Sequence, residues 1–154
     1  MNDTLNMEGK IKLDIYSADG ELKDTTGWIK NIITNAGKAQ LALLAGDASA
    51  TPFTYLAVGT SATAVAATDT TLTAEIVDSG LARAAGTVSR VTTTVTNDTL
   101  QVTYTWTATG SKTIEEIGLF NASSAGTMLG HALTTSKALT NTDTLAATYQ
   151  VKFS

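Results

Sequence analysis

The sequence has no cysteine, one proline and a single histidine among its 154 residues. Without cysteine there is no disulfide framework, no thiol nucleophile and no thiolate metal site. A histidine-based metal site or a Ser-His-Asp triad could use only His131, and no strained Gly-x-Ser-x-Gly turn presents a serine. We therefore expect His131 to be a strand residue that faces solvent or a subunit interface.

Charged and aromatic residues are also scarce, at 16% and 6% of the chain. The formal net charge of −4 argues against a nucleic-acid partner, because phosphate binding needs clustered lysine and arginine. The lysines between Lys10 and Lys38 alternate with acidic residues, and we interpret them as a solvated face. No run approaches the roughly 20 apolar residues of a membrane span, and the N-terminus lacks the features of a secretion signal. We therefore expect no membrane partner and synthesis in the cytoplasm.

The motifs of common catalytic sites are missing as well. There is no glycine-rich phosphate loop and no Asp-x-Asp-x-Asp-Gly calcium loop. Glu115 and Glu116 are adjacent, so on a strand they point to opposite faces and cannot converge on one substrate. Most aromatic residues fall on the apolar phase of their strands, which favours core packing over a sugar-binding platform. The sequence predicts no enzyme, no catalytic residue, no cofactor and no metal site.

What the sequence does contain is alternation typical of strands. It is strict over 10–15, over 88–95 with 100–106 around an Asn97-Asp98 turn, and over 145–153. Further strands are expected at 53–58, 114–121 and 128–133. Thr34 and Asn35 can cap one helix over 36–44, with Gly46 as its stop. The pattern predicts a mainly β fold: an antiparallel β-sandwich or flattened barrel of about eight strands with one short helix.

The remaining segments are expected to be irregular. Residues 1–9 are interpreted as a flexible N-terminal arm, and residues 10–154 as a single β-rich domain. Residues 60–71 are small and polar and should form a long surface excursion with little packing of its own. A helical turn over 72–77 and a polar loop over 134–143 complete the expected organisation.

Several segments, taken in order and spacing, carry a family resemblance. They are Asn31-Ile-Ile-Thr-Asn-Ala-Gly-Lys-Ala, Phe53-Thr-Tyr-Leu-Ala-Val-Gly-Thr, Ala66-Ala-Thr-Asp-Thr-Thr-Leu with Glu75, Ile114-Glu-Glu-Ile-Gly-Leu-Phe-Asn-Ala, and Asp143-Thr-Leu to Phe153. From about Lys10 to the last residue, the chain resembles a widespread group of tailed-bacteriophage structural proteins. Some members of this group look like capsid decoration (cement) proteins, and others are tail-fibre or collar components.

The resemblance implies a component of the virion that is made in the bacterial host. The leading hypothesis is a capsid decoration protein, a homotrimer that binds the outside of the major capsid protein shell and stabilises it. The alternative is a tail-fibre, collar or receptor-binding module. A third class, a carbohydrate-binding or hydrolytic enzyme, would need a surface aromatic row or convergent carboxylates. The residues predicted to contact a partner are Met1, Asn2, Asp3, Thr4, Leu5, Thr60, Ala64 and Val65.

Overall fold

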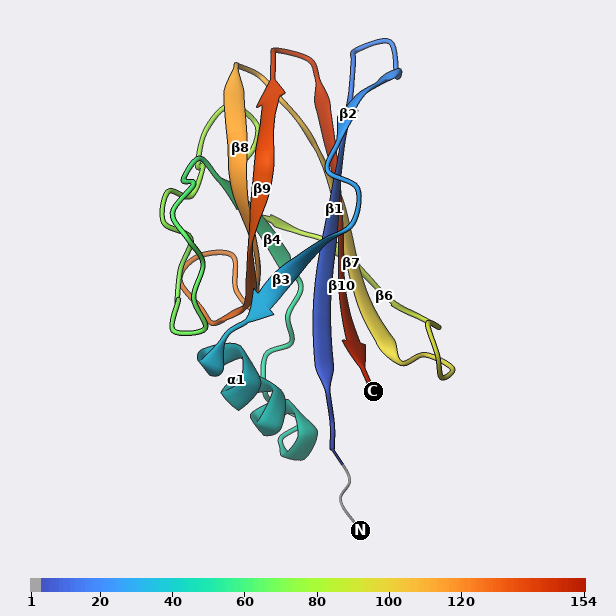
Figure 1. Cartoon of the computed structure of the whole chain (residues 1–154). Helices are drawn as coiled ribbons and strands as arrows, with labels where there is room; N and C mark the ends of the chain where they lie inside the picture. The colour runs from blue at the N-terminus through green and yellow to red at the C-terminus, as the bar shows by residue number, and fades with distance from the viewer. Residues whose placement is uncertain (1–3) are drawn as a thin grey trace.

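The structure is a computed structural model that describes residues 4–154, and these residues form ten strands and one helix (Figure 1). The strands are β1 (Met7–Tyr16), β2 (Leu22–Thr25), β3 (Ile29–Ile33), β4 (Tyr55–Gly59), β5 (Ala84–Ala85), β6 (Thr87–Val91), β7 (Thr99–Thr107), β8 (Lys112–Phe120), β9 (Met128–Leu139) and β10 (Thr144–Phe153). The helix is α1 (Asn35–Gly46). The chain is mainly β, as predicted.

The strands form two antiparallel layers joined along one side by β3. One layer has the order β2-β1-β10-β7-β6 and the other β5-β4-β8-β9-β3. The first residues of β3 pair with β1, from Gly9↔Asn31 to Ile11↔Ile29. Its last residues pair with β9, where Ile32 lies opposite His131. A single strand therefore passes from one layer to the other.

On the opposite side, the chain itself closes the barrel at Gly86. β5 pairs with β4 in one layer and β6 pairs with β7 in the other, and only Gly86 lies between them. The Gly86 N–H donates to the Thr54 carbonyl at 2.8 Å. A Cβ at this position would lie 2.6 Å from Cγ1 of Val102, too close for any side chain. The absence of a side chain thus lets the strand turn the corner. The fold is a nearly closed antiparallel barrel or sandwich, in agreement with the predicted β-sandwich or flattened barrel.

The core follows the alternation of apolar and polar residues in β1 and β10. Ile11, Leu13 and Ile15 of β1 are fully buried, and they face the interior together with Leu145, Ala147, Tyr149 and Val151 of the neighbouring β10. Because side chains of a strand alternate between its faces, the polar residues between them face outwards. The prediction of half-buried strands at both ends of the chain is confirmed.

The helix α1 also begins where its capping signal predicts. The Thr34 hydroxyl accepts a hydrogen bond from the Gly37 N–H at 2.9 Å and donates to the Met128 carbonyl. At the other end, the Asp47 N–H donates to the Leu43 carbonyl. The helix contacts β9 and lies across one end of the barrel (Figure 1). Thr34 therefore both caps the helix and fixes it to the sheet.

Three strand boundaries differ from the predictions. β1 begins at Met7, so residues 7–9, which were assigned to the N-terminal arm, belong to the sheet. β6 ends at Val91, short of the expected residue 95. β9 continues to Leu139, so 134–139 is strand where a polar loop was predicted. Its polar side chains are satisfied by distant partners: Thr134 donates to the Ile114 carbonyl, and Lys137 pairs with Asp24.

The long segment between β4 and β5 also differs from its prediction. It contains no helical turn over 72–77; instead the Ile76 N–H donates to the Val58 carbonyl, and Gly59 forms an isolated bridge with Glu75. Leu72, Ile76 and Leu81 are buried. We call residues 60–83 the covering loop, because Leu72 packs over β4 and β8 in a second apolar cluster with Ala57, Phe120 and Met128. No residue of 60–71, the segment predicted to have little packing of its own, is buried; the buried residues of the covering loop come after it.

Candidate functional site

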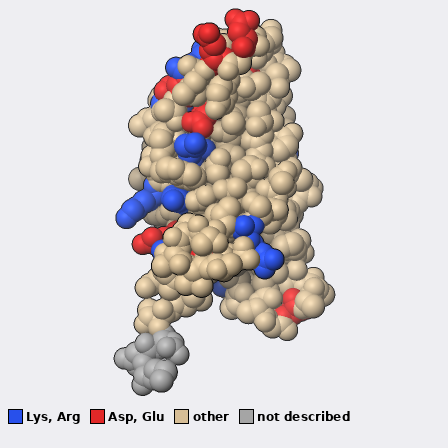
Figure 2. Space-filling model, turned by 90° about the vertical axis from the view of Figure 1, so that its right-hand side faces the viewer, with Lys and Arg blue, Asp and Glu red and all other residues tan. Residues whose placement is uncertain are grey.

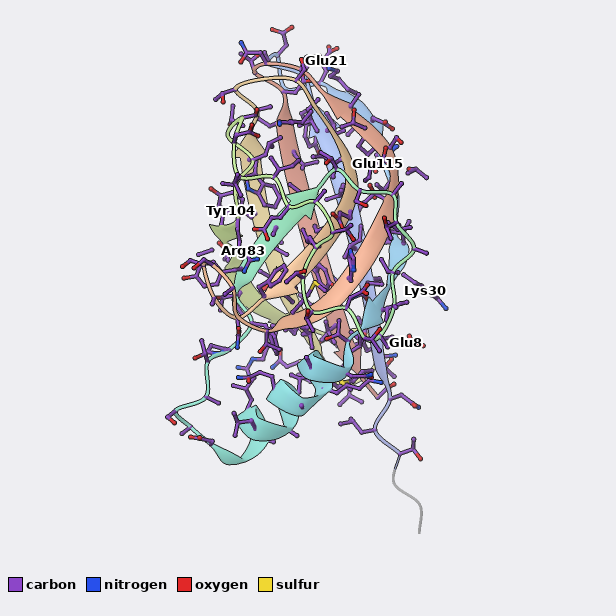
Figure 3. The ribbon with its side chains drawn as sticks, turned by 90° about the vertical axis from the view of Figure 1, so that its left-hand side faces the viewer. Glu8, Glu21, Lys30, Arg83, Tyr104 and Glu115 are labelled. Atoms are coloured by element: carbon purple, nitrogen blue, oxygen red, sulfur yellow. The ribbon has the colours of Figure 1, made fainter. Side chains whose placement is uncertain are left out.

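A cavity of about 510 Å³ lies beside α1 among the described residues. It lies where the first residues of β1, the last residues of β10, strand β3 and the β6–β7 turn meet. Figure 3 shows Lys30 and Glu8 on this side of the molecule, close to the helix. We call it the lysine cavity; its lining residues are Met7, Glu8, Gly9, Lys10, Lys30, Asn31, Ile33, Lys38, Thr93, Thr94, Gln150 and Lys152.

The cations of this cavity lack the ion pairs that the other lysines make. Within residues 4–154, salt bridges engage Lys12, Lys23, Lys112, Lys137 and Arg83. Of the five other cations, four line the cavity, namely Lys10, Lys30, Lys38 and Lys152, and Glu8 is the one carboxylate in its lining. In Figure 2, which faces the side opposite to that of Figure 3, acidic side chains gather at the top of the barrel and a few lie lower down. The cavity is therefore a positive region on a chain of net negative charge.

Strand register places two of these lysines directly against each other. Lys10 of β1 is the register partner of Lys30 of β3, and on its other side it faces Gln150 of β10. Like charges in directly opposed positions destabilise a sheet. The Lys10 ammonium also lies 4.6 Å from the ring centre of the exposed Trp28, a favourable cation–π distance. The ring thus offsets part of the repulsion.

The inner side of the cavity is polar. The Asn31 side chain donates to the hydroxyl of Tyr149, while its own amide oxygen is buried and has no partner among the described residues. Burial raises the pKa of Tyr149 well above its usual value, and the hydrogen bond from Asn31 opposes this only in part, so the hydroxyl stays neutral. Asn31 thus brings an amide oxygen without a partner among the described residues to a cavity that four lysines line.

One rim of the cavity, formed by Thr93 and Thr94, is shaped by Asp98. Its carboxylate accepts from the backbone N–H groups of Thr93, Thr94 and Val95 at 2.8–2.9 Å. Burial tends to raise the pKa of Asp98, but these hydrogen bonds to the charged form outweigh it and hold the pKa well below its ordinary value. The N–H groups of residues 93–95 thus bond to the carboxylate of Asp98 and not to a neighbouring strand, which explains why β6 ends before residue 95.

Replacing Asp98 by asparagine is expected to destabilise the protein in a pH-dependent way. Because the pKa of Asp98 is lowered by folding, its contribution is complete above the unfolded value of 3.8 and is lost as the pH falls further. Denaturant midpoints at pH 7 should therefore be lower for Asp98→Asn than for the wild type. The gap should narrow below about pH 4. A gap that stays constant down to pH 2 would contradict this account.

A second polar cluster fastens the covering loop to the barrel. His131 is buried, and its Nδ1 and Nε2 lie 2.8 Å from Oδ2 of Asp69 and 2.8 Å from Oε2 of Glu116. A neutral imidazole has a single N–H, so both contacts are hydrogen bonds only if the ring, or one of the carboxyl groups, carries a further proton. The expectation that His131 faces solvent or an interface is wrong, because the covering loop buries it.

Glu116 is the centre of this cluster. Its buried carboxylate also accepts from the N–H groups of Thr73 and Ala74, at 3.1 and 2.7 Å. Burial would raise the pKa of Asp69, but hydrogen bonds from the Ala66 N–H and from His131 lower it. The adjacent Glu115 points the other way, to Ser136, as strand geometry requires. We call Glu116, His131 and Asp69 the loop clasp, and its chemistry is structural.

Arg83 closes the far end of the covering loop. It makes a bidentate ion pair with Glu75 at 2.6 and 2.9 Å and donates to the carbonyls of Ala122 and Ala125. Its guanidinium also lies 3.6 Å from the ring centre of Phe120. All of these contacts of the Arg83 guanidinium are made within the protein. Arg83 therefore anchors the covering loop to the barrel.

The residues predicted to contact a partner lie in two separate regions. Thr4 and Leu5 are exposed, and Met1, Asn2 and Asp3 lie outside the described residues. Thr60 and Ala64 are exposed and Val65 is half-buried, all in the covering loop. Figure 1 shows this loop along the side of the barrel, whereas the first strand begins at its lower end. Nothing in the structure tests whether these residues contact a partner.

In the range 4–154, no group of three or more histidine, cysteine, aspartate or glutamate side chains could hold a metal ion. A search of the same residues found no helix with the length and apolarity that crossing a membrane requires. What remains is a rigid barrel with a positive cavity and a fastened loop.

A family model matches most of the sequence. Residues 32–151, from β3 to β10, match the family model described as Podophage GP4 fiber I protein gp80. The chain belongs to this family. No curated protein and no solved structure matches it. Membership in the gp80 family confirms the resemblance to tailed-phage structural proteins and assigns the chain a structural role in the virion.

The lysine cavity was missed from the sequence, although one signal was present. The run from Lys10 to Lys38 was interpreted as a solvated face because acidic residues alternate with it. In the structure Asp14 pairs with Lys12, and Asp24 pairs with Lys137 from β9. The nearby carboxylates are thus used elsewhere, and this leaves the cavity lysines together.

Proposed function

We propose that this gp80-family chain is a component of a fibre of a tailed-phage virion. The observation that carries the proposal is the family match, which spans residues 32–151 and is described as a fibre protein. The alternative named in the sequence analysis, a tail-fibre or collar module, thus becomes the preferred assignment. The protein acts by shape and binding, with no chemical step.

The architecture fits this role. A barrel closed by Gly86 leaves few unpaired strand edges, so the module can stand close to identical copies without edge-to-edge aggregation. The loop clasp and Arg83 hold the covering loop against the barrel. A fibre module exposed on a particle benefits from such a fixed surface, because a rigid surface loses little entropy when it binds.

Copy number in purified virions tests the proposal. Quantitative mass spectrometry should give a few copies of this chain per particle, in a fixed ratio to other tail components and far below the major shell subunit. Labelled antibodies seen by electron microscopy should then bind at the tail. An abundance comparable to that of the shell subunit would contradict the fibre assignment.

The second candidate is capsid decoration, with the major capsid protein as partner and a homotrimer as the bound form. The compactness of residues 4–154, which include no extended shaft, favours it (Figure 1). Its contacts would come from the N-terminal residues and from Thr60, Ala64 and Val65. Adding the purified protein to undecorated capsids should then raise their resistance to heat in proportion to occupancy. Failure to bind such capsids would exclude it.

A further inference from the structure

We propose that the lysine cavity is a binding site for an acidic saccharide, that is, a sugar of one or two rings that carries phosphate or carboxylate groups. The inference is independent of the chain's position on the virion. It rests on the charge of the cavity, its size and its neutral lining.

The charge argument comes from the distribution of ion pairs. Half of the ten lysine and arginine residues make a salt bridge within the described residues, and four of the other five line this one cavity. Lys10 and Lys30 are held in directly opposed register positions, which is unfavourable without an anion. Lysine is a common ligand of phosphate and carboxylate groups. An anion between the two ammonium groups would convert repulsion into attraction.

The size and the lining of the lysine cavity favour a ligand larger than a single inorganic ion. The volume of about 510 Å³ falls in the range of small-molecule sites and exceeds what one phosphate needs. Thr94 contributes a hydroxyl and Gln150 an amide oxygen to the lining, whereas the Thr93 hydroxyl already bonds to Asp98 and the Gln150 amide N–H to Gln101. Such neutral groups can pair with sugar hydroxyls as donors and as acceptors. A ligand that combines several hydroxyls with one or more negative charges uses both kinds of lining.

The walls of the cavity are held by the rest of the fold. Lys10 and Lys152 are carried by the paired strands β1 and β10. Lys38 is carried by α1, which Thr34 fixes to β9. The threonine rim is shaped by Asp98. A site whose side chains come from rigid elements loses little entropy when a ligand binds.

Titration calorimetry of the full chain at low salt tests the proposal, with glucose 6-phosphate, glucuronate, neutral glucose, inorganic phosphate and a hexaglutamate peptide as probes. We expect glucose 6-phosphate and glucuronate to bind more tightly than inorganic phosphate, and neutral glucose not to bind. Binding should weaken as salt is added, because ions screen exposed charges.

A matched pair of double variants locates the site. Lys10→Gln with Lys30→Gln should weaken glucose 6-phosphate binding at least about tenfold, because two charge-assisted contacts are lost. Arg90→Gln with Lys112→Gln removes the same charge outside the cavity and should leave affinity unchanged. Lys30→Gln alone should be at least as stable as the wild type, since it relieves the opposed charges.

Each other outcome overturns the proposal. Inorganic phosphate that binds as tightly as the sugar phosphate would make this a simple anion site. Preference for hexaglutamate would make it a site for an acidic peptide. Equal loss in both double variants would show a general effect of net charge, and no binding of any probe at millimolar concentration would mean that the cavity is not a ligand site.

Discussion

Replacing Glu116 by glutamine is expected to lower the free energy of unfolding by about 3–5 kcal/mol, the usual cost of removing one partner from a buried charged cluster. The carboxylate accepts from the N–H groups of Thr73 and Ala74, and its Oε2 lies 2.8 Å from Nε2 of His131. The amide of glutamine would place a donor where one of these donors already points. Because a domain of this size is stable by only about 5–15 kcal/mol, the loss should be plain in a urea midpoint.

Glu115 provides the matched control. It is the next residue on β8 but points to the other face, where its carboxylate meets the exposed Ser136. Glu115→Gln should change stability by no more than about 0.5 kcal/mol. Hydrogen exchange adds a local measurement: the amides of Thr73 and Ala74 should lose protection in Glu116→Gln and keep it in Glu115→Gln. Equal midpoints for the two variants would contradict the loop clasp.

Replacing Gly37 by alanine should destabilise the protein, although alanine normally favours a helix by about 1 kcal/mol over glycine. A Cβ at Gly37 would lie 2.6 Å from Cα and 2.7 Å from the carbonyl oxygen of Leu129 on β9. Backbone atoms of a central strand cannot move aside as the end of a side chain can. We expect a loss of about 1–3 kcal/mol, the usual cost of overpacking, or a displacement of α1.

For Gly46, at the other end of the same helix, replacement by alanine is expected to have the opposite effect on stability. An added Cβ there meets nothing within 4 Å. Gly46→Ala should therefore leave the thermal midpoint unchanged or raise it slightly, within about 1 kcal/mol of stabilisation. The two alanine variants differ only in position, so opposite signs would establish close packing of α1 on β9. A gain in stability in both variants would mean that the helix does not lie against the strand.

Sequence reasoning succeeded where one face of an element meets the core. Apolar and polar residues alternate strictly in β1 and β10 because the outer faces of these strands stay polar. Thr34 marks the start of α1 because its hydroxyl caps the helix. It failed where burial is created by partners distant in the chain. The sequence around Lys137 is that of a polar loop, because its partner Asp24 lies more than a hundred residues earlier in the chain. No local pattern contains that information.

The candidate site was unpredictable for the same reason. The lysine cavity combines Lys10 and Lys30 with Lys152 from the other end of the chain, so only the strand register brings them together. The covering loop is fastened through backbone N–H groups, which leave no mark on the side-chain sequence. The opposed directions of Glu115 and Glu116 were predictable because they follow from strand geometry alone.

The pairing of the first and last strands determines how the barrel bears a mechanical load. β1 and β10 are antiparallel neighbours from Met7↔Phe153 to Tyr16↔Thr144, and Asn6 and Ser154 extend the ladder at the same end. Tension that pulls these two ends apart breaks the hydrogen-bonded pairs of the ladder one after another, so the force needed to separate the strands is low. Tension between one end and the wall of the barrel loads many hydrogen bonds at once. The protein therefore resists force best when a particle binds it at one end of the ladder and at the wall of the barrel.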